Sequence, residues 1–315
     1  MEWKNKKVIV TGGAGVIGRD LVKKLADKGA IVRCFDIAPK PQVFSDNIKY
    51  YQGDLSQLNP IEFEDFNPQI IFHLAASFER TKEETDFWEP NFSNNVLLSH
   101  KVVDVAKSCK GLEKFIFASS YLIYDPTIYL FKDPNSNPIV LRENYAVSPR
   151  NLCGAAKYYT ERELGYLRSF KETYSFKTIS ARIFRVYGQG SKDVISRWIR
   201  TGLNNETIKL FLKQGSFDYI FADDVSSGLL KLAESDLAEG VVNLGSGVST
   251  KIGKVVEILK KYLPGLKVEE VEKQGLFEAS SADISRLKQI TNWQPEVNLE
   301  QGIKSILEYE AKQKN

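Results

Sequence analysis

Short apolar runs alternate with longer segments of helical periodicity over the first half of the chain. The runs are predicted strands, at residues 7–10, 30–36, 48–52, 69–74, 114–119 and 176–183. Between some of them lie predicted amphipathic helices, at residues 18–28, 92–108 and 152–170. Strands separated by helices of this length form βαβ units around a parallel sheet. Because such crossovers are right-handed, the pattern predicts a doubly wound α/β fold of the Rossmann type.

The rhythm changes after about Gly190. Segments become shorter and turn residues more frequent, as at 203–205 and 263–265. We therefore expect two domains that share one compact body. Residues 1–190 would form the Rossmann domain, and residues 191–315 a smaller mixed α/β domain for substrate, partly interleaved with the first.

Composition argues against several classes of function. The 315 residues include 43 basic and 40 acidic side chains, a net charge of +3 that offers no strong field for nucleic acid or a membrane surface. The N-terminus does not read as a signal peptide, and no apolar run approaches the ~18 residues that span a bilayer. Cys34, Cys109 and Cys153 are widely spaced, as are His73 and His100, which disfavours a metal site. We expect a cytoplasmic protein.

A glycine-rich turn joins the first predicted strand to the first predicted helix. In TGGAGVIG, Gly12, Gly15 and Gly18 are spaced GxxGxxG. Such glycines permit a tight turn, a close approach of pyrophosphate and close packing of helix on strand. The helix N-terminus, at Val16 and Ile17, adds unpaired N–H groups that favour an anion. The turn predicts a dinucleotide site.

Asp36 ends the second predicted strand. A carboxylate at this place accepts hydrogen bonds from the adenosine ribose hydroxyls and repels a 2′-phosphate. Arg33 lies three positions earlier, where it is a poor clamp for such a phosphate. Asp36 therefore favours NAD over NADP, the alternative being an ordinary turn residue at the end of a strand.

Taken with later motifs, the turn resembles the extended short-chain dehydrogenase/reductase family, specifically its nucleotide-sugar epimerases and dehydratases. The motifs follow one another in order, at residues 53–55, 73–76, 94–96, 115–124, 182–188, 219–225, 243–247, 283–286 and 293–295. The resemblance implies that further residues border the cofactor, namely Asp54, Leu55, Leu74, Ala75, Ala76, Asn95 and Lys157. It also implies a homodimer built on the helices at 92–108 and 152–170.

The resemblance implies a first step in which a base removes a sugar hydroxyl proton while NAD takes the hydride from the same carbon. The keto sugar is then reduced from the other face, or loses water. Ser120 would bond the reacting hydroxyl. In the family a Tyr four residues before the Lys carries the proton, and here Cys153 stands in that position before Lys157.

Three interpretations of this departure are open. The Cys153 thiol, with a reference pKa of about 8.5 that falls beside a cation, is one candidate base. Tyr121, Tyr124 or Tyr145 could act instead. In the third interpretation turnover is lost and the protein is an NAD-binding sensor or scaffold.

The residues after Ser120 bear on the type of reaction. The Asp-Glu pair that supports water loss in dehydratases of the family is replaced by Tyr121 and Leu122. Epimerisation is therefore favoured, with dehydration or reduction as alternatives. Phe217 stands where the family often has an Arg that grips the substrate diphosphate. The possible phosphate partners that remain are Arg185, Lys192, Arg197, Arg200 and Arg286. Arg185 is the best of them, because its motif borders the sugar, and a surface role is the alternative.

Overall fold

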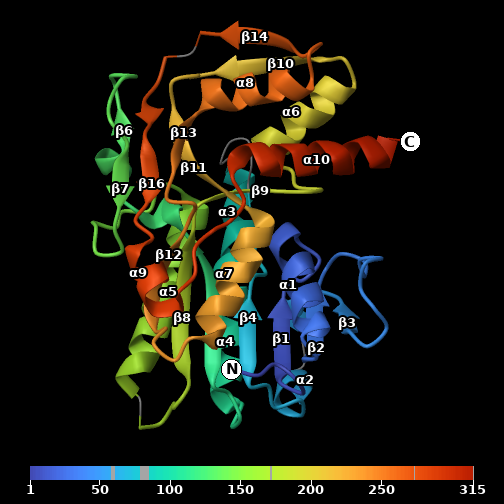
Figure 1. The fold of residues 1–315 in the computed structure, drawn as a ribbon. Coiled ribbons are helices and arrows are strands. Elements are labelled where there is room, and N and C mark those ends of the chain that lie inside the picture. Colours follow the sequence, from blue (N-terminus) through green and yellow to red (C-terminus); the bar gives the residue numbers. More distant parts are fainter. Residues whose placement is uncertain (58–60, 79–84, 171, 273, 315) are drawn as a thin grey trace.

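The computed structural model describes residues 1–57, 61–78, 85–170, 172–272 and 274–314 (Figure 1). In this described part of the chain, seven parallel strands form the central sheet in the order β12-β8-β5-β4-β1-β2-β3. The strands are β1 Lys7–Thr11, β2 Ile31–Asp36, β3 Lys49–Gln52, β4 Ile70–His73, β5 Lys114–Ser120, β8 Lys177–Ile183 and β12 Gly240–Leu244. From β1 the chain adds β2 and β3 on one side and then β4 and β5 on the other, so the order of strands across the sheet reverses between β1 and β4. At such a point a doubly wound sheet opens a ligand crevice at its carboxyl edge. The predicted fold class is confirmed.

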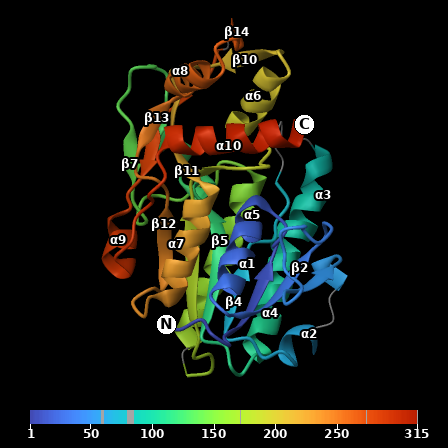
Figure 2. The same cartoon turned by 45° about the vertical axis from the view of Figure 1, so that its right-hand side comes forward.

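Alternation along the central strands divides the core into two layers. Val8 and Val10 of β1 belong to one buried cluster, and Ile9 belongs to the other. Successive side chains of a strand point to opposite faces, so a parallel sheet buried on both sides reads as a continuous apolar run. Figure 2 shows helices on both faces of this sheet.

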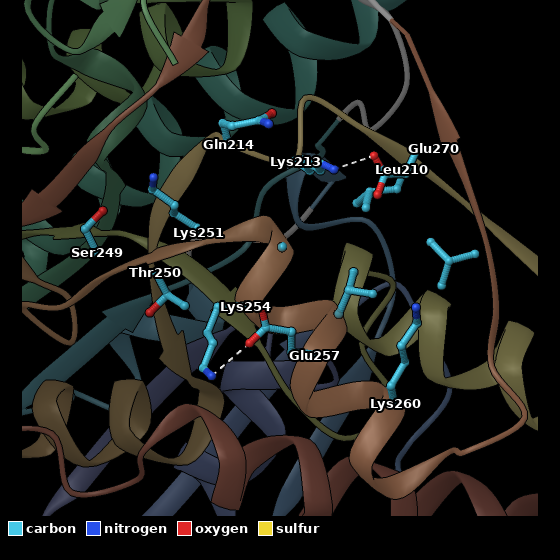
Figure 3. A pocket seen from close by; sticks show the side chains of 13 residues that line it. Leu210, Lys213, Gln214, Ser249, Thr250, Lys251, Lys254, Glu257, Lys260 and Glu270 are labelled. Carbon is cyan, nitrogen blue, oxygen red and sulfur yellow. Dashed lines mark hydrogen bonds and ion pairs between the residues drawn. The ribbon is translucent and has the colours of Figure 1, made fainter. Parts of the chain in front are cut away.

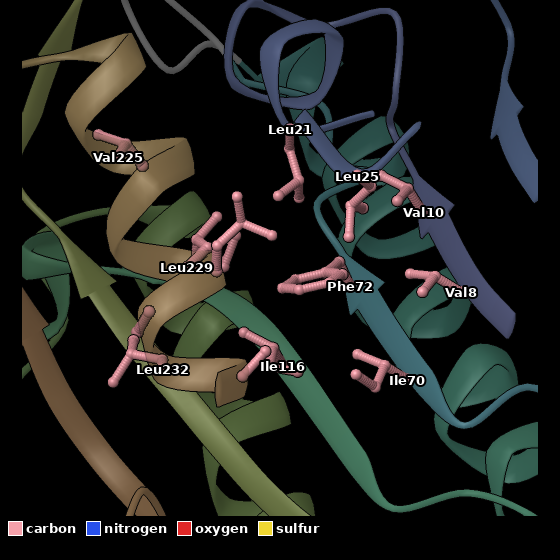
Figure 4. Close-up of a cluster of buried hydrophobic side chains, with 14 of the residues drawn as sticks. Val8, Val10, Leu21, Leu25, Ile70, Phe72, Ile116, Val225, Leu229 and Leu232 are labelled. Carbon is pink, nitrogen blue, oxygen red and sulfur yellow. The ribbon is translucent and has the colours of Figure 1, made fainter. Parts of the chain in front are cut away.

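The first layer is covered by α1 (Val16–Asp27) and α7 (Ala222–Glu234). Leu21 and Leu25 of α1 meet Leu229 of α7 over the sheet (Figure 4). The second layer is covered by α4 (Leu98–Ser108) and α5 (Leu152–Leu167). Their apolar residues recur every three or four positions, which puts them on one face of each helix.

The helix predicted at 92–108 is interrupted by one wider turn. It begins as α3 (Trp88–Asn91), continues as a π-helical turn over Phe92–Leu97, and becomes α4 from Leu98. A π-helical turn carries more residues than an α-helical one and recurs at functional sites. Here it buries Asn95, which is 3% exposed, while Phe92 stays exposed.

One edge strand was missed from sequence. β12 pairs with β8 at the edge of the sheet, although it comes from the half of the chain predicted to form the second domain. Its sequence, GVVNL, has only a short apolar run after Gly240. Residues on both sides of Gly190 therefore build the Rossmann sheet, since α7 also returns to cover it.

The second lobe packs around a separate apolar core. Its central sheet has β11 (Ser216–Phe221) between β9 (Arg185–Tyr187) and β13 (Ser249–Lys251). Its remaining elements are α6 Val194–Leu203, β10 Thr207–Phe211, α8 Ile252–Tyr262, β14 Lys267–Val271 and α10 Leu299–Lys314. Short elements beside the two lobes are α2 Ile61–Glu64, β6 Leu130–Phe131, β7 Ile139–Leu141, β15 Phe277–Glu278, β16 Ser280–Ala282 and α9 Ser285–Thr291.

A buried polar network joins β8 to α5, and β12 to the segment after β5, at the carboxyl edge of the sheet. Arg182 of β8 donates to both carboxylate oxygens of Glu161 on α5, with N–O distances of 3.1 and 2.9 Å. The Tyr124 hydroxyl donates to Asn243 of β12 at 2.7 Å. Because these groups are buried and paired, breaking one partner leaves an uncompensated polar group. No helix among the described residues is long and apolar enough to cross a membrane.

Candidate active site

The glycine turn has the geometry that its spacing predicted. Gly12 has a φ of +72°, and an added Cβ would lie 2.6 Å from the Ala75 backbone nitrogen. An added Cβ on Gly18 would overlap the Gly12 carbonyl oxygen. Gly15 is different, because its added Cβ would meet the Gly12 oxygen only at 3.2 Å. Gly15 is the N-cap of α1 and provides no side-chain cap, so the first N–H groups of the helix, from Val16 and Ile17 onward, remain for a ligand.

Asp36 lies against this turn. Its two carboxylate oxygens accept hydrogen bonds from the Ala14 and Ala38 backbone N–H groups, at 2.8 and 2.9 Å. A carboxylate has about four acceptor positions, so two remain. Under the turn, burial, with a further contribution from Asp36, raises the pKa of the Cys34 thiol to about 12. Cys34 is therefore a neutral packing residue at working pH.

The next predicted motif is held at the same edge. The Gly53 N–H donates to the Asp36 carbonyl at 2.9 Å. Leu55 is buried, and Asp54 is exposed and accepts from the Ser56 N–H at 2.8 Å. These contacts place Asp54 and Leu55 directly beyond the end of β2.

The segment after β4 follows the glycine turn. The Leu74 N–H donates to the Thr11 carbonyl at 3.1 Å, and the Ala75 N–H to the Thr11 hydroxyl at 3.2 Å. Ala76 is exposed. The Asn95 side chain accepts from the Ser77 N–H at 2.7 Å and donates to the Ser77 carbonyl at 2.8 Å. Asn95 thus fixes the course of this segment beside the turn.

His73 is a buried polar residue of β4. Its Nδ1 lies 2.7 Å from the Thr11 hydroxyl and its Nε2 lies 3.0 Å from the Ser99 hydroxyl. Burial, assisted by the positive charge of Lys157, lowers the His73 pKa to about 3. The ring is therefore neutral at working pH and serves to orient its neighbours.

Ser120 ends β5, and the start of α5 packs closely against the turn that follows it. The Ser120 hydroxyl accepts from the Leu122 N–H at 3.2 Å. Asn151 caps α5 by accepting from the Gly154 N–H at 2.8 Å. An added Cβ on Gly154 would lie 2.7 Å from the Leu122 carbonyl oxygen. This close approach sets the first turns of α5 beside the Ser120 turn.

Cys153 and Lys157 occupy successive turns on one face of α5. The Lys157 Nζ lies 4.7 Å from the centre of the Phe117 ring. Burial lowers the Lys157 pKa to about 8, partly opposed by Cys153. The Cys153 thiol donates a long hydrogen bond to the Ser77 carbonyl at 3.7 Å. Residues from β5, α5 and the segment after β4 therefore converge at one edge of the sheet.

The nearby tyrosines are buried phenols. Tyr121 stacks on Phe184, with ring centres 5.0 Å apart, and its hydroxyl has no hydrogen-bond partner in the described structure. Burial raises the Tyr121 pKa well above the usual range for a phenol. Burial also raises the Tyr124 pKa to about 12, and its hydroxyl is bonded to Asn243. Tyr145 is half-buried and packs against the same cluster.

Arg185 makes contacts that the sequence did not indicate. Its guanidinium carbon lies 3.9 Å from the centre of the Phe217 ring. Its Nη2 donates to Glu278 Oε2 at 3.1 Å, and Arg150 Nη1 donates to the same oxygen at 2.6 Å. Arg150 precedes the α5 cap, and Glu278 lies on β15, far along the chain. No local motif marks either residue, so only the tertiary structure brings them together.

The other basic candidates differ in their surroundings. Arg200 pairs with Glu310 at 2.6 Å, and Arg286 donates to the Glu239 carbonyl at 2.9 Å. A pocket of about 720 Å³ lies between β10, β14 and α8 in the second lobe (Figure 3). Its rim carries the ion pairs of Lys213 with Glu270 and of Lys254 with Glu257. None of the residues predicted for the cofactor or the chemistry lines this pocket.

Fold and turn together define a dinucleotide-binding α/β protein. The family model described as "NAD dependent epimerase/dehydratase family" matches residues 8–245. The chain belongs to this family, and its cofactor is NAD.

Relatives with similar sequence identity to this chain are named for different reactions. A putative UDP-glucose 4-epimerase of Methanocaldococcus jannaschii is 26% identical, over 96% of this chain and 97% of its own. A dTDP-4-dehydro-6-deoxyglucose reductase of Escherichia coli is also 26% identical, over 98% of both chains. The structure of a UDP-N-acetylglucosamine 4-epimerase from Methanobrevibacter ruminantium, in complex with UDP-N-acetylmuramic acid, superposes with a TM-score of 0.83. It is 27% identical and covers 98% of this chain and 99% of its own.

Proposed function

We propose that the protein epimerises a nucleotide sugar through a transient keto intermediate, with NAD bound throughout. The observation that carries this proposal is the convergence of Ser120, Cys153 and Lys157 at the carboxyl edge of the sheet, beside the glycine turn. NAD supplies the hydride chemistry when bound. UDP sugars are the first substrates to test, because two of the relatives described above are named for them.

Each of the three residues has a distinct role in the proposal. The Ser120 hydroxyl bonds the reacting sugar hydroxyl. Lys157 holds the nicotinamide ribose with its ammonium group, and its positive charge favours the anionic form of a neighbouring acid. Cys153 stands where the family carries a Tyr, and it moves the proton. A thiol is shorter than a phenol, so the sugar would approach α5 more closely or through one water molecule.

Cys153 is preferred over the tyrosines because it stands in the position of the family's proton-transferring residue, one turn before Lys157 on α5. A base at working pH needs a pKa that is not far above that pH. Burial raises the pKa of both Tyr121 and Tyr124, and Tyr124 is already bonded to Asn243. Tyr121 would therefore act as a hydrogen-bond donor to the substrate.

The cofactor contacts follow the predicted motifs. Gly12, Gly15, Val16, Ile17 and Gly18 would cradle the pyrophosphate, and Asp36 would accept from the adenosine ribose. The other proposed contacts are Asp54, Leu55, Leu74, Ala75, Ala76 and Asn95. Arg185 would contact the substrate.

Dehydration is the less favoured reaction. The residues after Ser120 are Tyr121 and Leu122, and neither supplies the carboxylate that water loss needs. Reduction of a keto sugar is an alternative, as is a sensor or scaffold without turnover. These alternatives differ in the sugar product and in whether NAD or NADH remains at the end of the reaction.

The test is product analysis by NMR. The NAD-loaded protein is incubated with UDP-glucose, UDP-N-acetylglucosamine, UDP-glucuronate and dTDP-glucose. Epimerisation yields the ring epimer of one of these sugars with no net change in NAD. A stable 6-deoxy keto product would indicate a dehydratase. Binding of NAD and nucleotide sugar without any new sugar would contradict the proposal and favour the sensor.

We also propose a homodimer that works in the cytoplasm. Large apolar side chains are exposed on neighbouring helices, at Trp88, Phe92, Leu97, Tyr159 and Tyr166. Apolar residues gathered on one face mark association sites. Light scattering should give twice the chain mass, and Phe92→Glu with Tyr159→Glu should give a monomer. Leu237→Glu, which changes an exposed residue before β12, is the control; a monomeric native protein would contradict the proposal.

A further inference from the structure

A cluster of two partly exposed arginines, a buried carboxylate and two buried phenols lies at the carboxyl edge of β5 and β8. We call Arg150, Arg185, Glu278, Tyr121 and Tyr129 the arginine cluster. Both guanidinium groups donate to one oxygen, Oε2 of Glu278. The Glu278 side chain is 3% exposed, whereas those of Arg150 and Arg185 are 32% and 36% exposed. The carboxylate is thus inside, and the two cations reach toward the surface.

The charges of the arginine cluster do not balance. Arg150 and Arg185 each carry one positive charge, and Glu278 is the one carboxylate within hydrogen-bond distance of them in the described residues. One positive charge is therefore uncompensated. Two partly buried cations that share one carboxylate leave a net positive charge, and an anionic ligand would offset it.

The arginine cluster also contains polar atoms that lack partners. The buried atoms Tyr121 Oη, Tyr129 Oη and Arg185 Nε have no hydrogen-bond partner in the described structure. The two phenol rings are neighbours, with centres 6.3 Å apart, and the Arg185 guanidinium lies 5.9 Å from the centre of the Tyr121 ring. All three atoms can donate a hydrogen bond, and a carboxylate offers about four acceptor positions. Together they suit an oxyanion better than a neutral hydroxymethyl group.

The position of the arginine cluster indicates which part of a substrate it would meet. Tyr121 directly follows Ser120, which is proposed to bond the reacting hydroxyl. Arg150 directly precedes the cap of α5, the helix that carries Cys153 and Lys157. Two members of the arginine cluster thus adjoin the elements that carry the chemistry, while Arg185 comes from β9 and Glu278 from β15. A sugar bonded to Ser120 would lie beside them.

We propose that the arginine cluster binds a carboxylate on the sugar ring, so that the preferred substrates are nucleotide-linked sugar acids. Arg is suited to this task because its planar fork donates two parallel hydrogen bonds to one carboxylate. The inference rests on the proposed function, because it assumes that a nucleotide sugar reaches Ser120.

The experiment measures binding of UDP, UDP-glucose and UDP-glucuronate to the NAD-loaded protein by calorimetry. We expect UDP-glucuronate to bind about 10-fold or more tightly than UDP-glucose, the effect of one or two charge-assisted hydrogen bonds. Arg150→Gln and Arg185→Gln should each remove most of that preference and change UDP affinity by less than about threefold, since neither would touch the diphosphate.

A matched control and a second variant guard against misfolding. Arg168→Gln makes the same change at the far end of α5, where Arg168 donates to Thr178 at 3.1 Å. It should leave the preference intact. Tyr121→Phe removes a single oxygen and should reduce the preference without altering NAD binding.

Two failures are distinguishable. Equal binding of UDP-glucose and UDP-glucuronate by the native protein overturns the inference alone. An equal loss of UDP affinity in Arg150→Gln or Arg185→Gln also overturns it, because the cluster would then hold the diphosphate. If none of the three nucleotides binds while NAD does, and dTDP-glucose does not bind either, the proposed function fails as well.

Discussion

The glycine turn and the arginine cluster lie at the same edge of the sheet, but they differ in how far their buried polar groups are hydrogen-bonded. At the turn, Thr11 and His73 contact each other at 2.7 Å, and Asp36 accepts from two backbone N–H groups. In the arginine cluster, three of the six buried side-chain polar atoms that lack a partner in the described residues come together. Buried polar groups are rarely left unpaired, so such a concentration points to a missing partner.

The difference teaches how each region obtains its shape. The turn is completed by the chain itself, through backbone contacts between β1, β2 and the segment after β4. It presents a preformed cradle to a ligand that the whole family shares. The arginine cluster is assembled from residues distant in sequence and is incomplete without a further acceptor. We interpret the first region as the cradle for the cofactor and the second as a site for part of the substrate.

The largest effect is expected at the turn. Gly18→Ala would push a methyl group into the Gly12 carbonyl oxygen, and α1 would have to move away from β1. Overpacking against backbone at this contact should lower NAD affinity by about 100-fold or more. Fluorescence titration with NAD measures it. Gly265→Ala, whose added Cβ meets no atom within 4 Å, is the control. An unchanged NAD affinity in Gly18→Ala would show that the glycine turn does not bind NAD.

The next effect is expected at Cys153. Loss of a group that transfers a proton typically costs about 100-fold or more in rate, so Cys153→Ala should lower kcat by that factor. NAD affinity should change little. Cys109→Ala, a substitution of another buried thiol, should leave kcat intact. Full activity in Cys153→Ala would contradict this role and assign the proton transfer to a tyrosine.

A pH effect of about 10-fold is expected from Lys157. Burial lowers the Lys157 pKa to about 8, so the ammonium group is present below that pH and is lost as the pH rises through it. The positive charge assists both the ribose contact and the proton transfer. The value of kcat/KM, which reports groups of the free enzyme, should therefore fall about tenfold per pH unit above about 8. Lys157→Met should be less active at every pH, and its kcat/KM should no longer fall above about pH 8. If kcat/KM still falls there in Lys157→Met, another group is responsible for the decrease.

The smallest effect is expected at Asp36. Asp36→Asn keeps hydrogen-bond capacity at the end of β2 but removes the charge that repels a 2′-phosphate. The ratio of NAD affinity to NADP affinity should fall by about 10-fold or less. Competition binding of the two cofactors measures it. A preference for NAD that survives in Asp36→Asn would show that another residue selects the cofactor.

Much of the fold could be predicted from the sequence, because it follows from local periodicity. Six strands of the sheet and helices α1, α4 and α5 lie where their apolar patterns place them, to within a few residues. The edge strand β12 was missed because its short apolar run carries little signal without its neighbour β8. The π-helical turn at Phe92–Leu97 was missed because the apolar spacing does not reveal one extra residue in a turn.

The candidate site divides in the same way. Gly12, Gly15, Gly18 and Asp36 stand out in the sequence because a turn and a strand end are local, and their spacing carries the chemistry. The pairing of Arg150 and Arg185 with Glu278 spans 128 and 93 positions. Such pairing depends on how the second lobe closes over the sheet. The sequence alone thus determined the class of fold and predicted the turn proposed for NAD, because both depend on local spacing. Only the tertiary structure decided that Arg150, Arg185 and Glu278 come together, because their pairing spans distant parts of the chain.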